Sequence, residues 1–286
     1  MSATTMNSTP KQRKHQAIKP DALKVPGLVK LTGKRVVLAS ASPRRKEILA
    51  TFVRTSHSLC FAKLMYVCFV WFALLEPGVK GVEPEIVPST FDETLPLSEF
   101  EDVHEYPVAT ATQKAVEVYE RLVAENPDDP PDLVIGADTV VLTHTLPLSS
   151  DVHPSLLPSD RPEILEKPTS KADNLRMLLD LNGAACEVVT GVSLVYPVLQ
   201  APGYQIKSMD ERSIVHFSQN PTHVLEAYAD SGEGLDRAGG FAVQGLGGAL
   251  VKKVDGDWNN VVGFPAAAFL RFLDLLVQEE DDFLEM

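Results

Sequence analysis

The sequence predicts an α/β fold, because short apolar segments typical of strands alternate with longer segments of helical periodicity. The chain has 286 residues, of which 44% are hydrophobic and 23% charged, as in a globular protein that buries a sizeable core. This composition excludes a collagen-like, a disulfide-rich and a wholly disordered protein.

The first predicted elements lie before residue 125. Residues 35–40 are expected to form a short buried strand. Ser42 and Pro43 mark the start of a helix, because proline suits the first helical position. Residues 106–124 predict a second helix, since their apolar side chains recur at helical spacing.

The second half of the chain continues the alternation. Residues 132–138 are expected to form an apolar strand that ends at its acid, Asp138. A capping-box pattern at 170–173 opens a helix, and Gly183 ends it. The remaining predicted elements are strands at 188–196 and 206–217, a helix from 220, a glycine-rich loop at 231–248 and a helix at 265–277.

The charge is distributed unevenly along the chain. Residues 1–35 hold eight bases and one acid, so the rest carries 18 bases against 38 acids, a net charge of −20. Residues 1–32 predict a disordered basic tail, 33–278 a single domain and 279–286 an acidic tail. Since so acidic a body repels a phosphate backbone, we expect no nucleic-acid polymer as a partner.

The three cysteines form neither a disulfide framework nor a paired CxxC metal motif. Such sparse cysteines suit a reducing compartment, and the first 30 residues lack the apolar core of a secretory signal. We therefore expect a cytoplasmic protein. A transit peptide is the alternative to a disordered tail at the basic start of the chain.

Residues 40–45 (SASPRR) form the first candidate site, at a strand-to-helix turn. Free amides at a helix N-terminus attract anions, and Arg44 and Arg45 can each fork onto phosphate oxygens. The alternative is a solvated helix start with two surface arginines.

Asp138 is the second candidate, within the segment 136–139 (GADT) at the end of an apolar strand. Open α/β sheets bind ligands at that edge. A carboxylate there can hold Mg²⁺ or Mn²⁺, or accept a proton from water. The alternative is an aspartate that caps a turn or a helix.

Two loops supply further candidates. Lys167, held stiffly by Pro168, can act as a point charge for a phosphate, the alternative being a plain surface lysine. Residues 230–245 are rich in glycine, which lets the backbone approach a ligand closely. In that loop, the Gln244 amide can both donate to and accept from the edge of a base. A flexible loop is the alternative.

Taken in order, these segments resemble the Maf family of nucleoside triphosphate pyrophosphatases. The resemblance covers about residues 34–277 and rests on the motifs at 38–45, 89–93, 114–115, 136–139, 165–168, 190–192, 231–240, 244–245 and 260–265. It implies a fold related to the inosine triphosphate pyrophosphatases, with a mixed twisted sheet and flanking helices around a nucleotide cleft.

The resemblance also implies an activity, the hydrolysis of a nucleoside triphosphate to the monophosphate and pyrophosphate with Mg²⁺ or Mn²⁺ as cofactor. Asp138 matches the family's proposed proton acceptor, and Glu93 and Asp138 would hold the metal. The family's phosphate and metal pocket matches Ser40, Arg44, Arg45, Glu93, Lys114 and Lys167.

Three positions bear on the substrate. Arg44, Thr139 and Gln244 match the branch that acts on dTTP and UTP, whereas the branch that acts on 7-methyl-GTP departs there. A 7-methyl-GTP pyrophosphatase and a non-catalytic regulator of septum formation and cell division are the alternatives. The chain also resembles the Maf-like part of larger proteins that carry a methyltransferase-like domain. A homodimer is compatible with the sequence.

The chain departs from the family pattern in three places. Arg237 replaces the usual lysine, and the loop at 143–162 is longer than usual. Residues 53–80 interrupt an otherwise continuous match, which suggests a translated intron. This insertion includes 59–75, a run of 17 residues with one charge, at the lower limit for a membrane span. A membrane anchor is the alternative, but we expect no membrane partner, because a span in mid-domain would have to return to the pocket.

Overall fold

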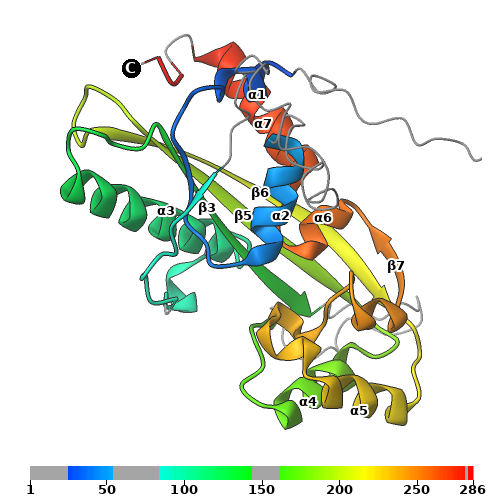
Figure 1. The fold of residues 1–286 in the computed structure, drawn as a ribbon. Coiled ribbons are helices and arrows are strands. Elements are labelled where there is room, and N and C mark those ends of the chain that lie inside the picture. The colour runs from blue at the N-terminus through cyan, green and yellow to red at the C-terminus, as the bar shows by residue number, and fades with distance from the viewer. Residues whose placement is uncertain (1–24, 54–83, 94, 144–161, 281–282, 286) are drawn as a thin grey trace, which may run out of the picture.

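The computed structural model describes residues 25–53, 84–93, 95–143, 162–280 and 283–285. Within them a mixed sheet of 7 strands has the order β2-β1-β3-β5-β6-β7, with β4 beside β3 (Figure 1). The strands are β1 (Val36–Leu38), β2 (Glu85–Ile86), β3 (Leu133–Thr143), β4 (Ile164–Leu165), β5 (Ala185–Pro197), β6 (Tyr204–Phe217) and β7 (Val251–Asp255). β1 is parallel to β2 and β3, and the other pairs are antiparallel. The predicted α/β class and mixed sheet are confirmed.

Helices flank the sheet on both faces (Figure 1). One face is covered by α3 (Glu105–Glu125), which packs against β3, β5 and β6. The other face carries α1 (Pro26–Lys30), α2 (Pro43–Val53), α6 (Trp258–Val262) and α7 (Ala266–Glu279). A separate lobe beyond the ends of the long strands contains α4 (Lys171–Leu181) and α5 (Thr222–Ser231), which pack against each other.

Alternation along β3 assigns its side chains to the two faces. Val134 is buried in the cluster under α3, and Ile135 in the cluster under α7. Gly136 again faces α3, where an added Cβ would lie 2.1 Å from the Ala111 carbonyl oxygen. This glycine lets the backbone of α3 approach β3 closely. As a result Asp138, two positions further along β3 on the same face, meets the side chain of Lys114 on α3 directly.

One edge of β3 is open in its middle. β1 pairs with β3 at residues 133–135 and β4 pairs with it at 141–142, while β5 follows the opposite edge from 134 to 143. Residues 136–140 therefore have no strand partner on the first edge among the described residues. Asp138 lies in this gap, and β3 continues past it, so the prediction that the strand ends at Asp138 is wrong. The pairing with β5 continues the ladder to Thr143.

The predicted start of the domain at residue 33 is too late. Residues 26–30 form α1, and Leu31 is fully buried against the core under α7. Gly27 packs on α7, where its N–H donates to Asp274 Oδ1 at 2.7 Å. This contact joins residues 247 positions apart, so the composition of the tail could not reveal it. Residues 25–32 are therefore not part of a disordered tail.

The predicted acidic tail also belongs partly to the domain. Phe283 and Leu284 are buried in the same core cluster as α7, and the Tyr196 hydroxyl donates to Glu280 Oε2 at 2.6 Å. These two apolar residues anchor a segment whose composition is otherwise mainly acidic.

Several predicted boundaries agree with the structure. α2 starts at Pro43, and the Ser170 hydroxyl accepts from the Asp173 N–H at the start of α4. The glycine-rich loop contains three short 3-10 helices, η3 (Glu233–Asp236), η4 (Ala238–Gly240) and η5 (Leu246–Ala249). β7 was not predicted from the sequence.

Two predicted insertions fall largely outside the described residues. Residues 54–80 of the apolar insertion and 144–161 of the long loop belong to the ranges that the structure does not describe. In the part of the chain that is described, no helix has both the length and the apolar character needed to cross a membrane.

Candidate active site

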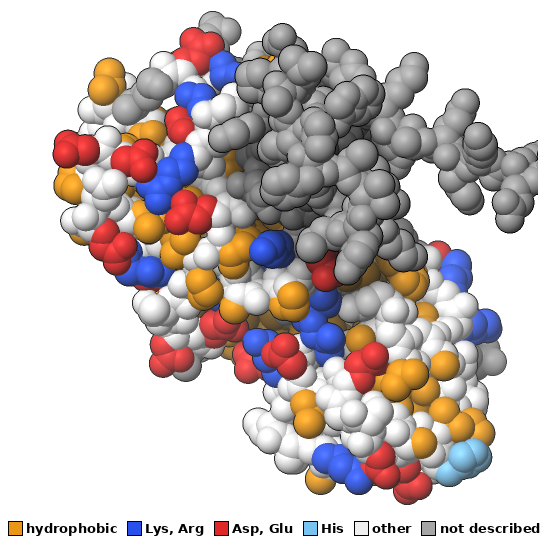
Figure 2. Space-filling model, in the orientation of Figure 1, with side chains coloured by type: hydrophobic (Ala, Val, Ile, Leu, Met, Phe, Trp, Pro, Cys, Tyr) orange, Lys and Arg blue, Asp and Glu red, His pale blue; other side chains and the backbone are white. Residues whose placement is uncertain are grey.

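A polar cavity of about 340 Å³ opens at the gap in the edge of β3. Its walls come from the end of β1, the start of α2, the α3 face, β3, the segments at 166–167 and 236–241, and the C-terminal end of α6 at 261–263. Figure 2 shows basic and acidic side chains together in the hollow between the body of the molecule and the lobe of α4 and α5. The open α/β edge is where such folds bind ligands.

Most of the predicted site residues meet in this cavity. Those that line it are Ser40, Arg44, Arg45, Glu93, Lys114, Asp138, Thr139 and Lys167. Gln244 does not line it, and its side chain is exposed in the turn before η5. Sequence order therefore brought together the phosphate-binding and metal-binding candidates, but not the residue expected to recognise the base.

The acidic side of the cavity faces α3. Lys114 Nζ lies 2.7 Å from Asp138 Oδ1 and 2.7 Å from Glu93 Oε1, so one ammonium joins two carboxylates. Lys114 and Asp138 are both buried, and their pairing compensates the cost of removing two charges from water. Burial alone would raise the pKa of Glu93, but the hydrogen bond and charge of Lys114 hold that pKa below its usual value.

Tyr106 is a residue of this side that the sequence analysis missed. Its hydroxyl lies 3.3 Å from Glu166 Oε1 and 3.4 Å from the Glu93 carbonyl oxygen. Burial and the neighbouring Glu166 raise the pKa of Tyr106 to about 12, so the hydroxyl is a neutral donor at pH 7. No motif in the sequence singles out this tyrosine as a site residue.

Thr139 follows Asp138 on β3, so its side chain faces the opposite side of the sheet. Arg45 joins it to the elements there: Nη2 donates to Thr139 Oγ1 at 3.0 Å, Nε to the Gly263 carbonyl at 2.9 Å and Nη1 to Ser40 Oγ at 3.3 Å. Burial lowers the pKa of Arg45, against the charges of Asp138 and Glu93, which raise it. Arg45 therefore fixes this wall with the same guanidinium donors that were expected to bind phosphate.

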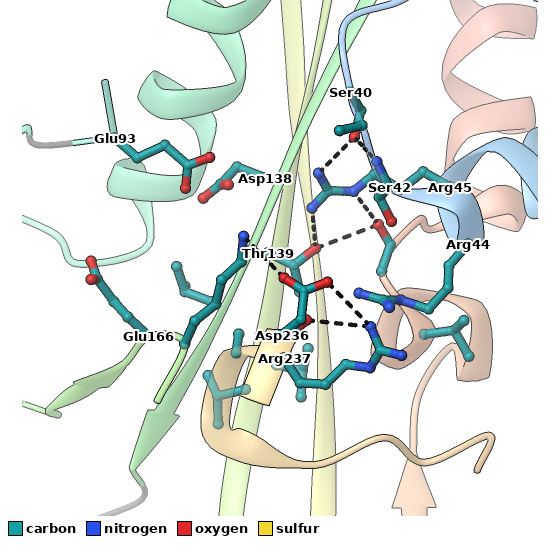
Figure 3. Close-up of a pocket in the computed structure, with 18 of the residues that line it drawn as sticks. Ser40, Ser42, Arg44, Arg45, Glu93, Asp138, Thr139, Glu166, Asp236 and Arg237 are labelled. Carbon is teal, nitrogen blue, oxygen red and sulfur yellow. Dashed lines mark hydrogen bonds and ion pairs between the residues drawn. The ribbon is translucent and has the colours of Figure 1, made fainter. Parts of the chain in front are cut away.

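The basic side of the cavity is more exposed. Arg44 is directed toward Asp236 and Arg237 (Figure 3). Lys167 Nζ lies 3.6 Å from Asp236 Oδ1, and Arg237 Nη1 lies 3.8 Å from Asp236 Oδ2. Burial lowers the pKa of Arg44, and the nearby Asp236 opposes this effect. Asp236 lies in the predicted glycine-rich loop but is not among the predicted site residues.

Glu93 and Asp138 fit a divalent metal that shares its coordination with a ligand. Both carboxylates already converge on one cation, the Lys114 ammonium. Within the described part of the chain, no group of three or more His, Cys, Asp or Glu side chains could hold a metal ion. Mg²⁺ is often held by one or two carboxylates together with substrate phosphates, which is the arrangement that these two side chains permit.

Fold and cavity together define a mixed α/β protein with a charged cleft, suited to a small anionic ligand, at the open edge of its sheet. The family model for Maf-like proteins matches residues 73–276 of this chain. The chain therefore belongs to the Maf-like family, as its motifs predicted.

Curated relatives agree with this assignment. The chain is 38% identical over 252 residues to the human "Probable bifunctional dTTP/UTP pyrophosphatase/methyltransferase protein", covering 87% of this chain and 33% of that protein. It is 34% identical to the dTTP/UTP pyrophosphatase of Schizosaccharomyces pombe, covering 88% of this chain and 87% of the relative. A Deinococcus radiodurans dTTP/UTP pyrophosphatase is also 34% identical, with 85% and 93% covered. The chain thus spans a third of the human relative and most of the other two.

Proposed function

We propose that this chain is an enzyme that hydrolyses dTTP and UTP to the nucleoside monophosphate and pyrophosphate. The main support for this proposal is that one cavity is divided into two sides. A buried acidic side surrounds Asp138, and a basic side contains Arg44, Lys167 and Arg237. A triphosphate carries about four negative charges, which clustered bases can balance within an otherwise acidic protein.

The acidic side supplies the groups for adding water to an anhydride. Water adds across the bond between the α and β phosphates: its oxygen bonds to phosphorus, the bridging P–O bond breaks, and pyrophosphate leaves. Asp138 is the acceptor for the proton that the water loses. Lys114 holds the Asp138 carboxylate in place through the hydrogen bond of 2.7 Å. The Tyr106 hydroxyl, neutral at pH 7, donates to Glu166 beside it.

The proposal includes a divalent metal, Mg²⁺ or Mn²⁺. Glu93 and Asp138 would hold it, with phosphate oxygens of the substrate as further ligands. When bound, the metal polarises the phosphoryl group and lowers the pKa of water. Lys114 contacts both carboxylates and would then hold the pair from one side.

The choice of dTTP and UTP rests on the names of the relatives and on Thr139, which lines the cavity. Gln244 would recognise the pyrimidine edge in the complex, a role that requires its exposed side chain to contact the bound nucleotide. Cytoplasmic location and a homodimer complete the proposal. The expectation of a reducing compartment rests on the sparse cysteines of the sequence.

The test is pyrophosphate release by the full chain with Mg²⁺ or Mn²⁺ across dTTP, UTP, CTP, GTP, ATP and 7-methyl-GTP. We expect the highest kcat/KM for dTTP and UTP, and no release after the metal is chelated. A preference for 7-methyl-GTP would contradict the substrate, and the absence of release from every nucleotide would contradict the enzyme.

A further inference from the structure

Asp236 differs from the other carboxylates of the cavity in what surrounds it. Glu93 and Asp138 share Lys114, and Glu166 lies beside Tyr106, all on the acidic side. Asp236 instead lies on the basic side, close to Lys167, Arg237 and Arg44 (Figure 3). A negative charge therefore stands where the cavity concentrates its positive charges.

The contacts of Asp236 are loose. Its distances to Lys167 Nζ and Arg237 Nη1 are 3.6 and 3.8 Å, longer than a hydrogen bond. The Asp236 side chain is 76% exposed and that of Lys167 is 61% exposed, so water screens the pair. Exposed ion pairs of this kind contribute little to stability, and a competing anion can replace them at little cost.

The bases around Asp236 have unused capacity for an anion. Arg237 Nε is buried and has no hydrogen-bond partner among the described residues. A single carboxylate offers two oxygens, whereas each phosphate group offers three or more acceptors. Lys167 Nζ, 3.6 Å from Asp236 Oδ1, is a donor that the Asp236 carboxylate does not pair, and a phosphate at this position would meet it.

We propose that Asp236 occupies, with a single negative charge, part of the site for a substrate phosphate group, and that the bound polyphosphate displaces it. This inference rests on the proposed function and adds a selectivity to it. The carboxylate competes effectively with a weakly charged anion such as orthophosphate. A triphosphate brings enough charge to the three bases to displace it. Asp236 is thus a specificity-determining residue that favours polyphosphate over single phosphate groups.

The experiment measures binding of orthophosphate and pyrophosphate to the full chain by calorimetry at constant ionic strength with Mg²⁺. Asp236→Asn removes the charge at nearly constant shape, and Asp236→Glu retains the charge. Asp230→Asn is the matched control, because Asp230 is an exposed acid of α5 that pairs with Lys171 outside the cavity.

We expect Asp236→Asn to bind both anions about 3- to 10-fold more tightly, as removal of one unit charge about 4 Å from a phosphate predicts in a well-hydrated site. The relative gain should be larger for orthophosphate, so that selectivity for pyrophosphate falls. Asp236→Glu and Asp230→Asn should bind as the unmodified chain does. Equal or weaker binding by Asp236→Asn would overturn the inference, weaker binding indicating that Asp236 itself helps to hold the ligand, for example through a metal.

Hydrolysis of dTTP and UTP is measured on the same proteins, and separates this inference from the proposed function. Tighter anion binding by Asp236→Asn without hydrolysis by any of the proteins would contradict the function and support the role of Asp236. Hydrolysis by the unmodified chain with unchanged anion binding in Asp236→Asn would support the function and overturn the role of Asp236.

Discussion

The two sides of the cavity hold their charges in different ways. On the acidic side Lys114 and Asp138 are buried and joined at 2.7 Å, whereas on the basic side Lys167 and Asp236 are exposed and 3.6 Å apart. A buried, closely paired group keeps one geometry, because leaving it unpaired would be costly. An exposed pair exchanges partners at little cost. The difference indicates that the acidic side is preorganised for chemistry and the basic side adapts to the ligand.

The largest effect is expected from Asp138→Asn, which tests whether the acidic side performs the chemistry. The substitution keeps the shape but removes the proton acceptor, so kcat should fall about 10²-fold or more. Steady-state pyrophosphate release measures it, with circular dichroism to verify the fold. Asp180→Asn, an exposed acid of α4 that pairs with Arg176, is the control and should keep full activity. Near-normal activity of Asp138→Asn with unchanged metal dependence would contradict the role of Asp138.

Lys167→Ala tests the complementary statement, that the basic side binds the phosphates shared by all substrates. Removal of one exposed positive charge should raise KM for dTTP, UTP and ATP alike, by about 3- to 10-fold at low salt, with little change in kcat. The effect should shrink as ionic strength rises, because exposed charges are screened. Lys171→Ala, at the start of α4 and outside the cavity, is the control. A fall confined to kcat would show that Lys167 belongs with the catalytic groups instead.

The separation along the chain between interacting residues decides which features of the fold the sequence could predict. Local signals predicted the Ser170 cap and the start of α2 at Pro43, because both depend on residues within one helical turn. The continuation of β3 past Asp138 depends on pairing with β5, whose residues lie about fifty positions away. The burial of Leu31 likewise depends on α7, near the other end of the chain.

Within the site, the ordered motifs name residues that line one cavity, with the exception of Gln244. Lys114 and Asp138 have one partner set that the fold dictates. Gln244 lies in an exposed turn, where no contact in the cavity fixes its side chain. The position of such a residue depends on a bound ligand, which a motif cannot convey.

Gln244→Ala tests an exposed residue that only the bound ligand would bring into contact with the cavity. Loss of a donor and acceptor for the pyrimidine edge should reduce discrimination between UTP and ATP by about 1–3 kcal/mol. The ratio of kcat/KM for UTP to that for ATP should therefore fall, while the value for ATP changes little. An equal fall for every nucleotide would show that Gln244 has only a structural role.

A structural contact next to this turn provides a control for that experiment. Glu233 accepts from the N–H groups of Leu246 and Gly247, at 3.1 and 3.0 Å, and so fixes the chain just after Gln244. Glu233→Gln should lower thermal stability and reduce kcat/KM for all nucleotides by the same factor. A selective loss of pyrimidine discrimination in Glu233→Gln would indicate that the position of the turn, rather than the Gln244 amide, sets the preference.

The smallest effect on activity is expected from Glu117, which supports the acidic side from outside the cavity. Its carboxylate accepts from Ser89 Oγ at 2.7 Å, from Thr90 N and Oγ1 at 3.1 and 3.0 Å, and from Arg121 Nε at 2.8 Å. These contacts attach the segment that carries Glu93 to α3. Burial would raise the pKa of Glu117, but the hydrogen bonds from Arg121, Ser89 and Thr90 lower it to about 2.

The stabilisation by Glu117 depends on pH in a direction that its pKa determines. Because the folded-state pKa of about 2 lies below the value of about 4.3 in an unfolded chain, the contribution is fully present above the unfolded value and is lost as pH falls toward 2. Glu117→Gln should lower Tm by about 2–4 °C at pH 7, and the difference from the unmodified chain should narrow between pH 4.5 and pH 3. Thermal melts over this pH range measure it, with Glu120→Gln, on the same helix, as the charge-matched control. A Tm difference that stays constant down to pH 3 would show that the ionised carboxylate of Glu117 is not what holds the Glu93 segment to α3.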